Sequence, residues 1–234
     1  RCEASGETAT AHEVVCTNGH TDAGAHYFCA DRAGTPVFSL THPDGDTLLA
    51  VRSLPDGGFA AVGDSRSVLA IFDERGALTG EVIPLDLEGV TRFEHGWIDM
   101  HEVIAITEGQ WAGAVAVLTA TGDEVDGRFV IANGVLVVDP VTLAVLWDWS
   151  AHGERGDDVP IDDKLDYERT GWLSDDTDWQ HANALLHRVR PDGGEEFWLS
   201  LRTQDWIIAV DAATDAVRWR LGCLLYTSPS PRDD

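Results

Sequence analysis

The sequence predicts an all-β chain, and three observations lead to that prediction. Short apolar runs recur from about residue 36 onward, and turn signals such as Asp-Gly and Gly-Gly separate them. No stretch shows the apolar periodicity of an amphipathic helix of three or more turns. A pattern of strand, Asp, short turn and Trp also repeats along the chain, which is typical of repeated sheet units.

Composition excludes several classes of partner. The 234 residues carry a formal net charge of −25, with 41 acidic against 16 basic side chains. Such a surface repels nucleic acid and anionic membranes, so neither is expected as a partner. No stretch is long and apolar enough for a membrane helix, so no membrane insertion is expected. The chain begins at Arg1, and the missing leader says nothing about compartment.

Residues 1–34 form a polar N-terminal segment that carries three of the four cysteines. Cys16 and Cys29 flank a mostly polar stretch, which suits a disulfide-closed loop in an oxidising compartment, periplasmic or extracellular. Metal binding is the rival, because two histidines lie between them, but the spacing fits no zinc template. Whether Cys2 is lipidated or paired stays open.

Residues 35–222 contain the predicted strands. The run at 47–52 is followed by the turn 55–58 and the run 59–62, which together form a predicted hairpin. The run at 67–72 leads into a second turn, at 73–76.

An internal repeat extends this pattern. An apolar strand ending at Asp139 leads through a short turn to Trp147, and a second ending at Asp211 leads to Trp219 in the same register. Asp73 marks a weaker third copy, so the three Asp positions are 66 and 72 residues apart. Four-stranded units with one loop insertion, at residues 151–178, fit this period. We therefore predict a partial β-propeller of four-stranded antiparallel blades, in which the tryptophans pack between blades. A β-sandwich is the alternative, but it would not repeat this pattern.

Two histidines stand in similar settings. His101 follows Asp99 and His181 follows Asp178, and each comes just ahead of an apolar strand. Arg202 lies one hairpin beyond His181. In a propeller such positions converge on one mouth of the central channel, where imidazoles and a guanidinium form an anion site.

At this point the chain resembles a known family. The run Asp178-Trp-Gln-His-Ala-Asn183, followed by Leu199-Ser-Leu-Arg202 and Trp219-Arg-Leu-Gly222, is similar to a run in the bacterial arylsulfotransferases. The segment around His101 looks like an earlier motif of that family. The resemblance is clear over residues 95–222.

This resemblance implies a six-bladed parent propeller that transfers a sulfuryl group from a phenolic sulfate to a phenol. It implies no cofactor, and it implies a sulfo-histidine intermediate. His101, His181 and Arg202 fall on catalytic positions, and Arg202 with Asn183 would bind substrate. The family's nucleophilic histidine lies beyond the Trp-x-Leu-Gly segment, where this chain stops, so we expect a fragment without activity. Which of His101 and His181 moves the proton stays open.

Two other functions compete with a sulfotransferase: a non-catalytic propeller that binds a partner, and a propeller of the quinoprotein type. The second would need cofactor-stacking tryptophans and a calcium site. The acidic cluster at residues 157–163 is more typical of a solvated loop than of a calcium site, so we predict no metal. A homo-oligomer stays open. Residues 223–234 resemble one reading frame of a library-preparation adapter, and we exclude this tail from the fold.

Overall fold

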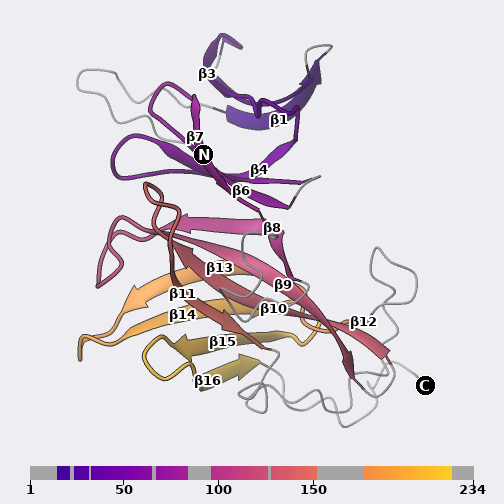
Figure 1. Cartoon of the computed structure of the whole chain (residues 1–234), viewed down its shortest axis with the longest axis vertical. Coiled ribbons are helices and arrows are strands. Elements are labelled where there is room, and N and C mark those ends of the chain that lie inside the picture. The colour runs from indigo at the N-terminus through magenta and orange to yellow at the C-terminus, as the bar shows by residue number, and fades with distance from the viewer. Residues whose placement is uncertain are drawn as a thin grey trace.

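The structure is a computed structural model that describes residues 15–21, 24–31, 33–64, 67–83, 96–125, 128–151 and 177–222. All regular elements in these ranges are β-strands, which confirms the all-β prediction (Figure 1). The strands are β1 (Val15–Thr21), β2 (Gly24–Ala30), β3 (Pro36–Leu40), β4 (Leu48–Ser53), β5 (Phe59–Gly63), β6 (Val68–Phe72), β7 (Leu78–Val82), β8 (Gly96–Ala105), β9 (Val115–Val125), β10 (Arg128–Val138), β11 (Val145–Ser150), β12 (Thr177–Asp178), β13 (Ala182–Val189), β14 (Glu195–Leu201), β15 (Trp206–Asp211) and β16 (Val217–Gly222). The predicted acidic cluster, Cys2 and the tail from residue 223 lie outside the described residues.

These strands form four sheets that follow one another along the chain (Figure 1). The orders are β1-β2-β3, β4-β5-β6-β7, β11-β10-β9-β8 and β13-β14-β15-β16, and the short β12 pairs with β10. All pairings within the four orders are antiparallel, and only β12 runs parallel to its partner. The predicted four-stranded antiparallel units are therefore present.

The first sheet crosses the expected boundary between residues 34 and 35. β2 pairs with β3, with Phe28 opposite Ser39 and Cys29 opposite Phe38. The polar composition before residue 35 hid these strands, because few apolar residues alternate there. A disulfide joins Cys16 and Cys29, which face each other across the β1–β2 pair.

The first strands of the three later sheets lie side by side. β4 contacts β8, and β8 contacts β13. Between successive sheets lie apolar layers whose side chains are almost fully buried, which is where burial stabilises the fold. Trp149 is buried in the layer between the third and fourth sheets, with Trp147 and Trp206 packed against it, as the sequence predicts for these tryptophans.

The repeated Asp residues have one structural role. The Asp139 carboxylate accepts hydrogen bonds from the N–H groups of Val141 and Thr142, at 2.8 and 2.9 Å. Asp211 accepts the equivalent bonds from Ala213 and Thr214 at 3.0 and 3.1 Å. Each carboxylate thus satisfies the backbone of the turn that follows its strand.

Each of these turns also contacts the neighbouring sheet. Leu143 and Asp215 occupy the same turn position, and both have a positive φ, 60° and 58°. Asp215 accepts a hydrogen bond of 3.0 Å from the indole of Trp147 in the preceding sheet. Leu143 lies against Gly80, which holds the same register position in its own sheet as Trp147 does. A large residue therefore meets a small one at both junctions, Gly80 against Leu143 and Trp147 against Asp215.

Candidate functional site

The site is built first on a bulge in β8. Pairing of β8 with β9 shifts register between Ile98 and Val103, which frees the residues between them from the ladder. Asp99 folds over this bulge, and its Oδ1 accepts the His101 backbone N–H at 2.9 Å. The same oxygen lies 2.6 Å from Nδ1 of the His101 ring. The bulge therefore presents His101, and Asp99 orients the ring.

The second histidine follows a segment fixed to β10. Trp179 is buried, and its backbone N–H donates to the backbone carbonyl of Ile131 at 3.1 Å. The buried Gln180 accepts the N–H of Asn133 through Oε1 at 2.7 Å. His181 then turns the chain with φ of 48°, in the left-handed region that a non-glycine residue enters only where the surroundings hold it there. β13 begins at the next residue.

The structure brings His101, His181 and Arg202 together. The two imidazole rings lie edge to face, with centroids 4.9 Å apart. Arg202 follows β14, and its backbone N–H donates to the His181 carbonyl at 3.2 Å. Its Nη1 lies 3.4 Å from His181 Nε2. Asn183 is exposed at the bulge that begins β13, next to His181.

Hydrogen-bond chemistry assigns the ring nitrogens. A guanidinium only donates, so His181 Nε2 is the acceptor in its contact with Arg202. Asp99 faces Nδ1 of His101, so Nε2 is the nitrogen of that ring turned away from the carboxylate. The two histidines are therefore not equivalent: His181 shares a nitrogen with a cation, and His101 has a carboxylate behind it.

Asn133 contacts residues that adjoin both histidines. This buried residue of β10 donates from Nδ2 to Asp99 Oδ2 at 3.2 Å and to the Thr119 carbonyl at 3.1 Å. Its Oδ1 accepts the N–H of Ala182 at 2.8 Å. The side-chain amide thus connects the His101 bulge to the start of β13.

A charged pair lies beside the site, on adjacent first strands. Arg52 of β4 donates to Glu102 at 2.7 Å. Burial raises the pKa of Glu102 above its ordinary value, and the positive charge of Arg52 offsets part of that rise.

Two other histidines contrast with this pair. His42 is buried and lies 2.7 Å from Glu81, and the half-buried His187 lies 2.9 Å from the buried Glu195. Glu195 also accepts the backbone N–H of Gln110. Both rings are enclosed and paired, so they hold the fold rather than meet a ligand.

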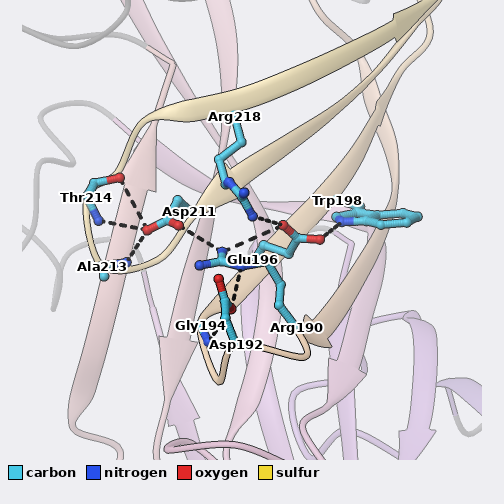
Figure 2. A network of polar contacts seen from close by, with 9 residues as sticks. All are labelled: Arg190, Asp192, Gly194, Glu196, Trp198, Asp211, Ala213, Thr214 and Arg218. Carbon is cyan, nitrogen blue, oxygen red and sulfur yellow. Dashed lines mark hydrogen bonds and ion pairs between the residues drawn. The ribbon is translucent and has the colours of Figure 1, made fainter.

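A second polar cluster lies at the other end of the fourth sheet (Figure 2). Arg190 donates to Asp211 at 2.8 Å and to Asp192 at 3.1 Å. Glu196 accepts from the Trp198 indole at 2.8 Å and from Arg218 at 3.3 Å. This arrangement is a closed set of ion pairs, and its carboxylates are matched by donors of the chain itself.

In the described ranges no group of three or more His, Cys, Asp or Glu side chains is placed to hold a metal ion. Within the same ranges no helix is long and apolar enough to cross a membrane.

Sequence reasoning named the two histidines, Arg202 and Asn183, but it gave no role to Asp99 or Gln180 and missed Asn133. The signal for Asn133 was a single amide in the middle of the otherwise apolar run of β10. A buried polar residue in such a run needs hydrogen-bond partners, and here the partners belong to the site.

Comparison with known proteins identifies the family. The arylsulfotransferase (ASST) family model matches residues 2–224. No curated protein matches the chain. Among solved structures, a Bacteroides caccae protein of unknown function has 7% identity, a TM-score of 0.49, and coverage of 90% of this chain and 58% of its own. The dihydro-heme d1 dehydrogenase NirN has 14% identity, a TM-score of 0.46, and coverage of 88% and 35%. The Neurospora crassa Pan2 WD40 domain has 13% identity, a TM-score of 0.43, and coverage of 88% and 51%.

The chain thus spans about half the length of these solved structures. The family match covers nearly all of its residues, including the segments around His101 and His181 from which the resemblance was inferred. The chain belongs to the arylsulfotransferase family.

Proposed function

We propose that this chain belongs to an enzyme that transfers a sulfuryl group from a phenolic sulfate to an acceptor phenol, through a sulfo-histidine and without a cofactor. The observation that carries the proposal is the meeting of His101, His181 and Arg202, with Asp99 behind His101, in a chain of this family. We expect the scaffold of the enzyme to be the six-bladed propeller that the family resemblance implies.

Arg202 and Asn183 bind the sulfate oxygens in this proposal. The planar guanidinium offers paired donors to a tetrahedral oxyanion, and both side chains are exposed. His181 adds a ring directed at Arg202 Nη1. Charge spreads over the sulfuryl oxygens in the transition state, so donors fixed before the reaction stabilise it.

His101 moves the proton in this proposal. In the first half-reaction the S–O bond of the donor breaks, an N–S bond forms on the nucleophilic histidine, and His101 Nε2–H protonates the phenolate that leaves. In the second half-reaction His101 takes the proton of the acceptor phenol, whose oxygen attacks sulfur as the N–S bond breaks. Asp99 orients the ring through Nδ1 in both steps.

The nucleophile is a third histidine in this proposal. His181 Nε2 faces the cation of Arg202, which opposes attack on sulfur by that nitrogen, and His101 is the proton carrier in this proposal. The family resemblance places the nucleophile after Gly222. The disulfide between Cys16 and Cys29 supports a periplasmic or extracellular site of action.

The test measures phenol release from a chromogenic aryl sulfate in the presence of an acceptor phenol. It compares the 234-residue chain with the protein encoded by the intact genomic reading frame that contains residues 1–222, which we call the genomic-frame protein. We expect the genomic-frame protein to turn over the aryl sulfate, and to gain the mass of one sulfuryl group on a histidine when the acceptor is omitted. We expect neither result from the 234-residue chain, and turnover by that chain would move the nucleophile to His101 or His181. A folded genomic-frame protein that turns over no donor would favour a non-catalytic binding module.

A further inference from the structure

The buried amide of Asn133 is matched to its surroundings on every side. Nδ2 faces two oxygens, Asp99 Oδ2 and the Thr119 carbonyl, and Oδ1 faces the N–H of Ala182. The backbone N–H of the same residue donates to Gln180 Oε1. Because the amide meets donors on one side and acceptors on the other, only one orientation of it is satisfied.

These partners lead to different histidines. Asp99 orients the His101 ring. Gln180 and Ala182 are the neighbours of His181 on either side, and both are bonded to Asn133. His181 holds a positive φ between these two anchors.

We propose that Asn133 is a positioning residue whose side chain fixes both histidines in their mutual geometry, His101 through Asp99 and His181 through the backbone N–H of Ala182. The role of this geometry in catalysis rests on the sulfuryl transfer proposed above, whereas the positioning itself does not. An aspartate at this position would set two carboxylates against each other, and an apolar residue would leave buried donors and acceptors unmatched.

Two variants separate the two branches. Asn133→Asp keeps the oxygen that accepts from Ala182 but removes both donors, so it should disturb His101 and leave His181 in place. Asn133→Ala removes the side-chain bonds to Asp99 and Ala182 and keeps only the bond from its backbone N–H to Gln180, so it should disturb both rings. The matched control is Thr121→Val, which removes a neighbouring buried contact of 3.2 Å between the hydroxyls of Thr121 and Ser150.

The readout is the imidazole nitrogen and proton signals of histidine-labelled protein, measured by NMR across a pH series, with His101 and His181 assigned through glutamine variants. We expect the His101 signals and their pH midpoint to shift in Asn133→Asp while those of His181 stay, and both to shift in Asn133→Ala. The proposal would be overturned if a folded Asn133 variant, like the control Thr121→Val, showed the same His101 and His181 signals as the starting protein. If Asn133→Ala does not fold, Asn133→Asp alone decides it.

Activity gives the second readout. In the genomic-frame protein Asn133→Asp should lower kcat/KM by about 10²-fold, because a small misplacement of a catalytic group costs this much. Thr121→Val should stay within about 3-fold of the starting protein. Shifted NMR signals without any sulfuryl transfer in the starting protein would reject the proposed function and keep the positioning role. If the starting protein is active and the Asn133 variants show unshifted histidine signals, the positioning role is rejected and the proposed function is kept.

Discussion

The two ends of the fourth sheet carry polar clusters of opposite character. At the end where β13 leads into β14 and β15 leads into β16, Arg190 and Arg218 are matched to Asp192, Glu196 and Asp211 (Figure 2). At the other end, Arg202 is exposed, and its guanidinium lies against a ring nitrogen of His181 rather than against a carboxylate. Both ends are built from the same strands.

The difference shows how one sheet separates stability from chemistry. Charged side chains that are paired within the chain use their donors and acceptors on each other, so few of these groups remain to bind a ligand. An exposed guanidinium beside two imidazoles retains donors for an anion from solution. At the histidine end the bulge of β8 and the left-handed conformation of His181 present the rings. At the cluster end the carboxylates of Asp192 and Asp211 accept hydrogen bonds from the backbone of their own turns.

The largest expected effect comes from Arg202. Arg202→Ala should lower kcat/KM of the genomic-frame protein about 10³-fold, because it removes donors to the charged oxygens of the transition state. The midpoint of thermal unfolding should barely move, since the side chain is exposed. The control is Arg188→Ala, an exposed arginine whose guanidinium lies 5.3 Å from the Trp198 ring. Equal loss of activity in both variants would contradict a specific role for Arg202.

The next effect belongs to the cluster end. Arg190→Ala leaves the carboxylates of Asp211 and Glu196 without their shared cation, and both are largely buried. We expect the unfolding midpoint to fall by several degrees while kcat/KM of the folded protein stays unchanged. Differential scanning calorimetry with parallel assays measures both. A fall in activity at constant stability would mean that the two ends are not independent.

The sequence predicted the strands better than it predicted the site. The apolar runs and turn signals gave the hairpin β4–β5 and the strands β10 and β15, because alternation and turn chemistry are local properties. The N-terminal strands β1 and β2 escaped because their residues are mostly polar. Asn133 escaped because its partners come from three separate segments, and such contacts exist only after the sheets have packed.

A smaller effect is expected at the junction between the third and fourth sheets. Trp147→Phe removes the hydrogen bond from its indole to Asp215 and should cost about 1 kcal/mol of unfolding free energy. Asp215→Asn is the control, because asparagine keeps an acceptor and tolerates the positive φ of 58°. Denaturant unfolding measures both variants, and an equal loss in each would mean that the charge of Asp215, rather than the hydrogen bond, holds the junction.

The smallest effect concerns the turn carboxylates in acid. Burial would raise the pKa of Asp211, but bonds from Arg190, Ala213 and Thr214 outweigh it and hold the pKa below its ordinary value. The N–H groups of Thr142 and Val141 likewise lower the pKa of Asp139, without an arginine. A carboxyl whose pKa is lower in the folded state stabilises the fold above its unfolded pKa, and this contribution is lost as pH falls through the folded value.

Both carboxylates should therefore make their full contribution to the free energy of unfolding above about pH 4, and this contribution should decrease below that pH. Asp211→Asn should lose stability at pH 7 and approach the starting protein as pH falls below about 4, because its missing charge no longer matters there. Asp139→Asn should show the same trend with a smaller difference, since asparagine can still accept from the turn. Denaturant unfolding at pH 7, 4 and 3 measures both, and the excess of the first variant over the second isolates the pairing of Asp211 with Arg190. An excess that persists at the lowest pH would show that Asp211 acts through turn geometry rather than through its charge.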